Sequence, residues 1–291
     1  MDNREEVREF LMTRRERVTP DAAGISAGAH RRVKGLRRSE VALLAGVSVE
    51  YYAKLERGAI AGASGAVLDA VSRALQLNDA EHAHLLDLAR NADGIPSSGR
   101  RRRRSTKPGP PRASLEWALA SITDAVAVVR DQRQNLIAFN ELGRAFYSPL
   151  IGDGGRTPNF ARFQFLDPAA RDFYPDWETF ADMCVAVIRA EAGRDPHDTG
   201  IQDLVGELST RSDVFRSLWA AHNVRTHGTG TKRFVHPVVG EVTLVYEELA
   251  LTADPGRVLL IYTAEPGSPS AERLRLLASW AAESAPARPP G

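Results

Sequence analysis

The stretch LRRSEVALLAGVSVEYYAKLERG (residues 36–58) decides the fold of the N-terminal region, because two short amphipathic segments meet in it at a glycine. Residues 38–45 and 48–56 both carry apolar side chains at helical spacing. Gly46 suits the turn between them, since glycine adopts a positive φ without strain. Ser48 suits the start of the second helix, because its hydroxyl can accept a hydrogen bond from an amide of the first turn. The stretch therefore predicts two helices joined by a tight turn.

The side chains of this helix pair divide into an inward and an outward set. The inward set packs the helices together and comprises Val41, Ala45, Val47, Tyr52 and Leu55. In a helix-turn-helix the outward set meets DNA. There Val49 suits a thymine methyl group, Glu50 the amino group of cytosine, and Lys54 the acceptors of guanine.

Basic side chains at the start of the first helix suit phosphate contacts, which fix the register of a protein on the duplex. The DNA-contacting set is then expected to be Arg37, Arg38, Ser48, Val49, Glu50, Tyr51, Lys54 and Arg57. The alternative is a helical hairpin that binds no DNA and whose charges are merely solvated.

Further helices are predicted on both sides of this pair. Residues 4–17, 66–75 and 80–91 have apolar side chains on one face each. Residues 1–94 are therefore expected to form an all-α domain of five helices.

The string GLRRSEVALLAGVSVEYYAKLERG resembles the XRE (lambda-repressor-like) family of helix-turn-helix regulators. Its small residues, the Ala-Gly-Val turn and the Leu-Glu-x-Gly ending carry the resemblance, through Gly35, Glu40, Ala42, Gly46, Val47, Leu55, Glu56 and Gly58. The resemblance covers about residues 4–92 and implies sequence-specific DNA binding. Many relatives have Gln or Arg where Val49 and Glu50 stand, so it does not define the base preference.

Positive charge is concentrated in the segment GIPSSGRRRRRSTKPGPPR (residues 94–112). Residues 1–94 are neutral overall, residues 95–112 carry a net charge of +7, and the remainder carries −6. Gly, Pro, Ser and Arg in this density cannot form a buried face, so residues 95–112 are expected to be a linker. The run of arginines at 100–104 either adds sequence-independent affinity for phosphates or is simply solvated.

The chain beyond the linker alternates strands and helices. Residues 125–131, 135–140, 232–237, 241–251 and 257–264 have the composition of strands. The helices are expected at residues 141–147, 177–192, 200–209, 213–221 and 271–282. Strands at both ends with helices between them predict an α+β domain with an antiparallel sheet over residues 113–283, followed by a disordered tail at 284–291.

This second region resembles the MmyB-like (MltR-type) ligand-binding domain, which looks PAS-like. The matching pieces are Phe139-Asn140, FLDPAARDFYPDWE (165–178), LVGELSTRSDVFRSLWAAHNVR (204–225), HPVVGEVTLVYEEL (236–249) and YTAEPGSPSAERLRLLASW (262–280). The resemblance implies a sensor of small molecules, and related domains are associated with fatty-acid-like ligands. The first residue of the FN pair is more often Trp, so the pocket shape is expected to differ here.

A sensor pocket is mostly apolar and aromatic, with a few polar groups that orient the ligand. The expected lining is Phe139, Phe146, Phe163, Trp177, Phe215, Trp219, Tyr246 and Tyr262, with polar ends from Asn140, His222 and His236. The alternative for each aromatic side chain is an ordinary place in the core.

Several classes of protein are excluded or disfavoured by composition. The single cysteine, Cys184, excludes disulfides within one chain and fits a reducing cytoplasm. No apolar run is long enough to span a membrane, and the N-terminus lacks the apolar core of a signal peptide. No motif of a common enzyme class and no zinc spacing is present, so neither a catalytic site, a metal nor a cofactor is expected.

These features together predict a cytoplasmic DNA-binding transcription regulator whose affinity for a double-stranded operator responds to a hydrophobic small molecule. A homodimer is expected, because one short recognition helix reads few base pairs and two-fold symmetry doubles the contacts. Repression is the expected role, although no residue determines the sign. The alternatives are a protein–protein adaptor whose helix-turn-helix no longer binds DNA, and an enzyme built on the α+β domain.

Overall fold

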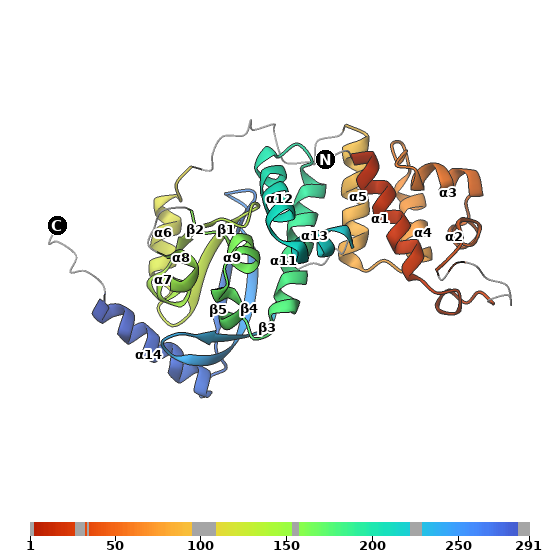
Figure 1. The fold of residues 1–291 in the computed structure, drawn as a ribbon. Coiled ribbons are helices and arrows are strands. Elements are labelled where there is room, and N and C mark those ends of the chain that lie inside the picture. Colours follow the sequence, from red (N-terminus) through yellow and green to blue (C-terminus); the bar gives the residue numbers. More distant parts are fainter. Residues whose placement is uncertain are drawn as a thin grey trace. The chain divides into compact units, whose positions relative to one another are not determined.

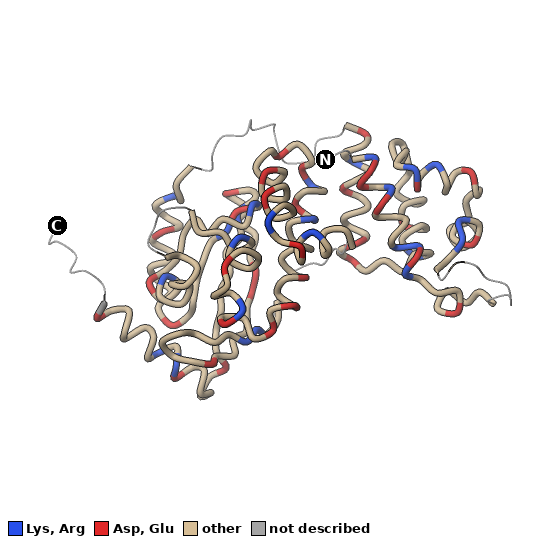
Figure 2. The backbone as a smooth tube through the Cα atoms, in the orientation of Figure 1, with Lys and Arg blue, Asp and Glu red and all other residues tan. Residues whose placement is uncertain are grey.

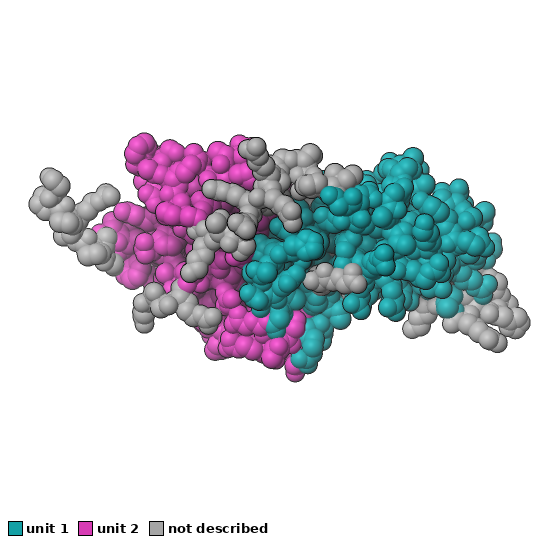
Figure 3. All heavy atoms as spheres, turned by 90° about the horizontal axis from the view of Figure 1, so that it is seen from above, with its two compact units in different colours: residues 1–106, 185–206, 216–226 teal, residues 107–184, 207–215, 227–291 magenta. Residues whose placement is uncertain are grey.

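The computed structural model describes residues 3–26, 33, 35–94, 109–152, 157–221 and 229–284. The arginine run and nearly all of the expected tail lie outside these residues. Contacts divide the chain into two compact units, shown in two colours in Figure 3. Unit 1 comprises residues 1–106, 185–206 and 216–226, and unit 2 comprises residues 107–184, 207–215 and 227–291.

Unit 1 contains the five helices that the sequence predicts, coloured red to orange in Figure 1. They are α1 (Asn3–Arg17), α2 (Arg38–Ala45), α3 (Val49–Glu56), α4 (Gly65–Ala74) and α5 (Asp79–Ala92), with a single turn of 3₁₀ helix at Asp21–Ala23. Their apolar faces form one core, which includes Phe10, Val41, Tyr52, Val71 and Leu88. The predicted all-α domain is confirmed.

The turn between α2 and α3 forms as its sequence predicts. Gly46 ends α2 with φ at 65°, in the left-handed region. Ser48 caps α3, because its Oγ accepts a hydrogen bond from the amide of Tyr51 at 3.0 Å. Val41, Ala45, Tyr52 and Leu55 are buried and Val47 packs against them, so the inward set is confirmed.

Two buried carboxylates hold the helices of unit 1 together through arginines. Glu81 of α5 lies 3.0 Å from Nε of Arg14 and 2.7 Å from Nη1 of Arg17, both in α1. Glu56 at the end of α3 receives Arg15 of α1 in the same way. Figure 2 shows acidic and basic residues interspersed along these helices, consistent with their neutral net charge.

Residues 185–206 and 216–226 also belong to unit 1. They come from α11 (Trp177–Arg194), α12 (Thr199–Arg211) and α13 (Asp213–Ala220). Arg189 of α11 is fully buried and donates to Glu6 of α1 and to the carbonyl oxygen of Trp219. The domain boundary expected from the sequence placed all three helices in the second domain. Their composition gives no sign that Arg189 of α11 pairs with the carboxylate of Glu6 in α1.

Unit 2 is built on a five-stranded antiparallel sheet (Figure 1). Its strands are β1 (Val126–Asp131), β2 (Leu136–Phe139), β3 (Thr229–His236), β4 (Gly240–Ala250) and β5 (Arg257–Thr263), in the order β2-β1-β5-β4-β3. All four strand pairs are antiparallel. The predicted α+β domain with an antiparallel sheet is confirmed.

Helices pack on the sheet of unit 2. On one face, Leu115 and Leu119 of α6 (Ala113–Ala120) pack with Ala127 and Val129 of β1. The other face meets aromatic side chains of α7 (Glu141–Phe146), α10 (Ala169–Phe173) and the beginning of α11. The short helices α8 (Ser148–Ile151) and α9 (Phe160–Leu166) lie between them in the chain, and α14 (Pro269–Ser284) packs against α7 and β4.

Candidate DNA-binding and ligand-binding sites

The outer surface of α3 carries the side chains expected to read DNA. Val49 is 42% exposed, and Glu50, Lys54 and Arg57 are exposed as well. Tyr51 is half-buried and packs against the core of unit 1, so only part of its ring faces outward. The first two turns of α3 thus present apolar, acidic and basic side chains together, a combination that can contact base edges in a major groove.

Arg37 and Arg38, at the start of α2, are both exposed, and Arg38 forms an ion pair with Glu56. Nε and Nη2 of Arg38 donate to Oε1 of Glu56 at 3.2 and 3.1 Å. Burial opposes ionisation of Glu56, but hydrogen bonds from Arg15 and Arg38 outweigh that effect and lower its pKa. Arg38 is therefore held in one orientation beside α3 by an ionised carboxylate.

In unit 2, several of the expected ligand-lining rings form one aromatic layer on the sheet. The ring centroid of Phe146 lies 5.0 Å from that of Phe234 and 5.6 Å from that of Phe173. Tyr262 lies 5.8 Å from Phe234 and 5.9 Å from Tyr246. Phe163 joins this layer through Phe173 and Tyr174. The structure thus brings Phe146, Phe163, Tyr246 and Tyr262 together.

The two expected polar ends that the structure describes are already hydrogen-bonded within the fold. Oδ1 of Asn140 accepts from the amides of Ala127 and Gly143, and its Nδ2 donates to the carbonyls of Ile122 and Ala125. Asn140 therefore caps α7 and ties it to β1 with its full hydrogen-bonding capacity.

His236 is also fully engaged. Its Nδ1 accepts from the amide of Val238 at 3.2 Å, so Nε2 carries the proton and donates to the carbonyl oxygen of Ala145 at 3.2 Å. Burial lowers the pKa of His236, which favours the neutral ring. Neither Asn140 nor His236 has a spare polar atom for a ligand.

Phe139 and Trp219, two further expected lining residues, make contacts with arginines instead. Phe139 is half-buried, with the guanidinium of Arg144 4.3 Å from its ring centroid. Trp219 belongs to unit 1, where Arg189 lies 4.0 Å from its ring centroid. His222 lies outside the described residues.

A pair of cations on the sheet was missed by sequence reasoning. Arg130 of β1 is 5% exposed, and its Nη2 donates to Oε1 of Glu248 at 2.6 Å. Within the described part of the chain, its Nη1 is buried without a hydrogen-bond partner. Nζ of Lys232 in β3 lies 4.1 Å from the ring centroid of Tyr246 and 5.5 Å from that of Tyr262.

The electrostatics of this pair follow from burial. Burial lowers the pKa of Lys232 to about 8; the carboxylate of Glu248 opposes that shift and the charge of Arg130 adds to it. Burial also raises the pKa of the Cys184 thiol to about 12, against the charges of Arg130 and Lys232. The sequence signal was present, because Arg130 and Lys232 occupy positions of strands β1 and β3 whose neighbours on the same face are apolar.

Two protein-family models match the sequence and identify the family to which the chain belongs. Residues 111–277 match the MmyB-like transcription regulator ligand binding domain, and residues 30–81 match a helix-turn-helix model. The chain belongs to the MmyB-like transcription regulators. It is a ligand-regulated DNA-binding transcription regulator, as both resemblances implied. A search of the curated proteins finds no match.

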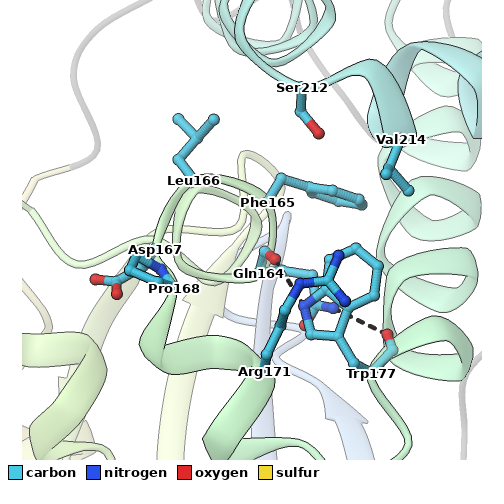
Figure 4. Close-up of a pocket in the computed structure, with 9 residues that line it drawn as sticks. All are labelled: Gln164, Phe165, Leu166, Asp167, Pro168, Arg171, Trp177, Ser212 and Val214. Carbon is cyan, nitrogen blue, oxygen red and sulfur yellow. Dashed lines mark hydrogen bonds between the residues drawn. The ribbon is translucent and has the colours of Figure 1, made fainter.

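One open pocket of this MmyB-like regulator lies in unit 2, with a volume of about 350 Å³. Figure 4 shows Arg171 lying over Trp177, with 4.0 Å from its guanidinium to the ring centroid. Nε1 of Trp177 donates to the carbonyl of Gln164, and Nε2 of Gln164 donates back to that of Trp177. The ring of Phe215 lies 5.1 Å from that of the lining residue Phe165 between centroids. Of the expected lining, this pocket includes only Trp177.

The described residues of the MmyB-like regulator show neither a metal-binding cluster nor a membrane span. No group of three or more His, Cys, Asp or Glu side chains is placed to hold a metal ion there. None of the helices described is long and apolar enough to cross a membrane.

Proposed function

We propose that this protein is a repressor that binds its operator through α3 and releases it, or tightens on it, when a hydrophobic small molecule occupies the second domain. The observation that carries the DNA-binding part is the exposed face of α3. Val49, Glu50 and Lys54 point away from a core that is otherwise fully packed. A helix that projects such side chains from a rigid helix pair has the form of a recognition helix.

A hydrophobic effector is supported by the aromatic layer on the sheet. Phe146, Phe173 and Phe234 lie between the helices and the strands, where a ligand that separated them would meet almost only apolar surface. The helix-covered antiparallel sheet also supports a PAS-like domain. The family resemblance supports the further proposal that the effector is fatty-acid-like.

The effector regulates DNA binding only if it has unequal affinity for the DNA-competent and DNA-incompetent arrangements. We further propose a homodimer on two half-sites, because α3 alone reads few base pairs. A cytoplasmic location is supported by the lone free cysteine. We also propose that the protein is not an enzyme.

The test is selection of the operator from random duplexes with the full-length protein, followed by titration of the selected duplex. The variant Lys54→Ala should lower specific affinity, while Arg275→Ala removes the same charge from an exposed position of α14 and should not. Salt-sensitive, sequence-specific binding supports the proposal. Failure to select any sequence, with intact folding, would favour the protein–protein adaptor.

A further inference from the structure

Helix α11 contributes residues to both compact units. Residues 177–184 belong to unit 2 and residues 185–194 to unit 1, and the helix is continuous through both. Near its beginning, the ring of Phe180 stacks on that of Tyr174 at 4.2 Å and lies 5.8 Å from that of Phe234. Tyr174 and Phe234 are members of the aromatic layer. The beginning of α11 is therefore part of the packing that an effector of the second domain is proposed to disturb.

The second half of α11 is held on α1 by a buried ion pair. Arg189 is fully buried, and its guanidinium donates to the carboxylate of Glu6, which is 4% exposed. The same guanidinium donates to the carbonyl oxygen of Trp219 in α13. An ion pair that is excluded from water fixes which residues face each other, since any other neighbour would leave a charge uncompensated. The position of α11 on α1 is thus specific.

A glycine allows the last turn of α11 to approach α5 closely. A Cβ atom at Gly193 would overlap the imidazole ring of His84. That ring has little room to give way, because His84 is 2% exposed and its centroid lies 5.0 Å from that of Phe10 in an edge-on contact. The carbonyl oxygen of Gly193 also accepts a hydrogen bond from Nδ2 of Asn91 in α5. The end of α11 therefore contacts α5 through its backbone.

The helix that receives α11 also supports the recognition helix. α1 packs against α3, and Nε of Arg15 in α1 lies 3.0 Å from Oε2 of Glu56 at the end of α3. Glu56 in turn orients Arg38 at the start of α2. A displacement of α1 therefore reaches two elements of the candidate DNA-binding surface through contacts that are already formed.

We propose that Arg189 and Gly193 hold the end of α11 on the DNA-binding helices, and that α11 conveys occupancy of the second domain to α3. We call these two contacts, Arg189 with Glu6 and Gly193 with His84, the α11 latch. An effector that separates the rings around Phe180 shifts the beginning of α11, and the stiff helix carries the shift to α1. This inference rests on the proposed effector control and names its route.

The test compares two glycine substitutions in the full-length protein, with decanoate as a fatty-acid-like probe. Gly193→Ala places a methyl group against His84, whereas Gly206→Ala adds the same group to α12 where no other part of the described structure comes within 4 Å. Decanoate should change the operator dissociation constant at least about fivefold in wild type and in Gly206→Ala, and less than about twofold in Gly193→Ala. Calorimetry should show equal decanoate affinity in all three proteins.

A double substitution tests the other contact of the latch. Glu6→Gln combined with Arg189→Met removes the ion pair without leaving one charge buried alone. It should also abolish the effect of decanoate on operator affinity and leave decanoate binding intact. Circular dichroism establishes that each variant is folded. A full decanoate response in both Gly193→Ala and the double variant would overturn the latch.

A measurement without any effector separates the latch from the proposed effector control. Phe180→Ala removes ring contacts at the beginning of α11, so it should change operator affinity in the wild-type background and not in the Gly193→Ala background. No change in wild type, or the same change in both backgrounds, would overturn the latch. The predicted non-additivity together with no response to bound decanoate would leave the latch standing and contradict the effector control.

Discussion

Nη2 of Arg38 lies 3.1 Å from Oε1 of Glu56, the last residue of α3. The contact joins the start of the first helix of the helix-turn-helix to the end of the second. Because Arg15 of α1 holds the other oxygen of Glu56 at 3.0 Å, the carboxylate is fixed and Arg38 is oriented before DNA arrives. A cation that is already oriented loses less side-chain entropy when it binds a phosphate.

The first prediction concerns this orientation. Arg38→Ala should weaken operator binding more than Arg37→Ala, since Glu56 orients the side chain of Arg38. Both substitutions should reduce the slope of log K against log salt, by about one for each phosphate that the protein no longer neutralises. Fluorescence anisotropy at several salt concentrations measures both quantities. Equally weakened binding in the two variants would remove the role assigned to Glu56.

Base reading by α3 gives the second prediction. Lys54→Ala should cost about 1–3 kcal/mol of specific binding and relax the base preference at one operator position. Glu50→Gln should change the preference at a neighbouring position, because an amide donates as well as accepts. Competition between the selected operator and single-base variants reads out both effects. Uniform weakening over all sequences would instead show that Lys54 contacts only phosphate.

The caps of α3 and α4 give a matched pair of stability predictions. Oγ of Ser48 accepts from Tyr51 at 3.0 Å, whereas Oγ of Ser64 lies 3.4 Å from the amide of Val67. Ser48→Ala should therefore cost about 1 kcal/mol of unfolding free energy, and Ser64→Ala less. Denaturant unfolding of both variants tests this order. The reverse order would mean that α3 is stabilised mainly by its buried face.

The buried carboxylate of Glu81 gives a stability prediction that depends on pH. Burial opposes its ionisation, but hydrogen bonds from Arg17 and the Asn78 amide, with the charge of Arg14, outweigh burial and lower its pKa below 4.5. A lowered pKa means that Glu81 stabilises the fold above about pH 4.5 and loses this contribution as the pH falls through its folded value.

Glu81→Gln should thus destabilise the fold at pH 7 by about 3 kcal/mol, since Arg14 stays buried beside a neutral group. The same variant should lose less stability than wild type on acidification. Glu16→Gln is the control, because Glu16 is largely exposed and lies 4.0 Å from Arg15, and it should change stability by less than about 0.5 kcal/mol. Thermal melts between pH 3 and pH 7 compare the three proteins.

Lys232 gives a prediction for the pH dependence of ligand binding. Because burial lowers its pKa to about 8, Lys232 is mostly charged at pH 7 and mostly neutral at pH 9. Decanoate affinity should therefore fall between pH 7 and pH 9, by up to about tenfold per pH unit above 8. Arg130 and Glu248 also face Lys232, and burial raises the pKa of Tyr246, Tyr262 and Cys184, so these three groups stay protonated in this window. A flat profile in wild type, or the same fall in Lys232→Met, would contradict the expectation that the charge of Lys232 attracts the carboxylate of decanoate.

The helices and strands of both units follow closely from the sequence where an element carries its own periodicity. The α2–α3 pair, with Gly46 and Ser48, and the alternating strands of the sheet are such elements. The short helices α9 and α10 were not predicted, because their dense aromatic side chains resemble a core strand or loop. α6 was likewise missed directly after the linker.

The candidate sites were less predictable than the fold. Periodicity identifies which side chains point outward from α3, and hence the DNA-facing set. It does not reveal which polar groups inside the sheet domain are already satisfied. Asn140 and His236 looked available in the sequence but use their polar atoms within the fold, whereas Arg130 and Lys232 looked like ordinary strand cations. Only the three-dimensional contacts separate these two cases.

The central claim is that a small molecule in the second domain changes the affinity of α3 for DNA. Its most direct test is the dissociation constant of the full-length protein for its selected operator, measured at fixed salt and pH 7 with and without saturating decanoate. We predict a change of at least about fivefold in wild type. An unchanged dissociation constant in wild type, under conditions where decanoate is bound, would contradict the claim.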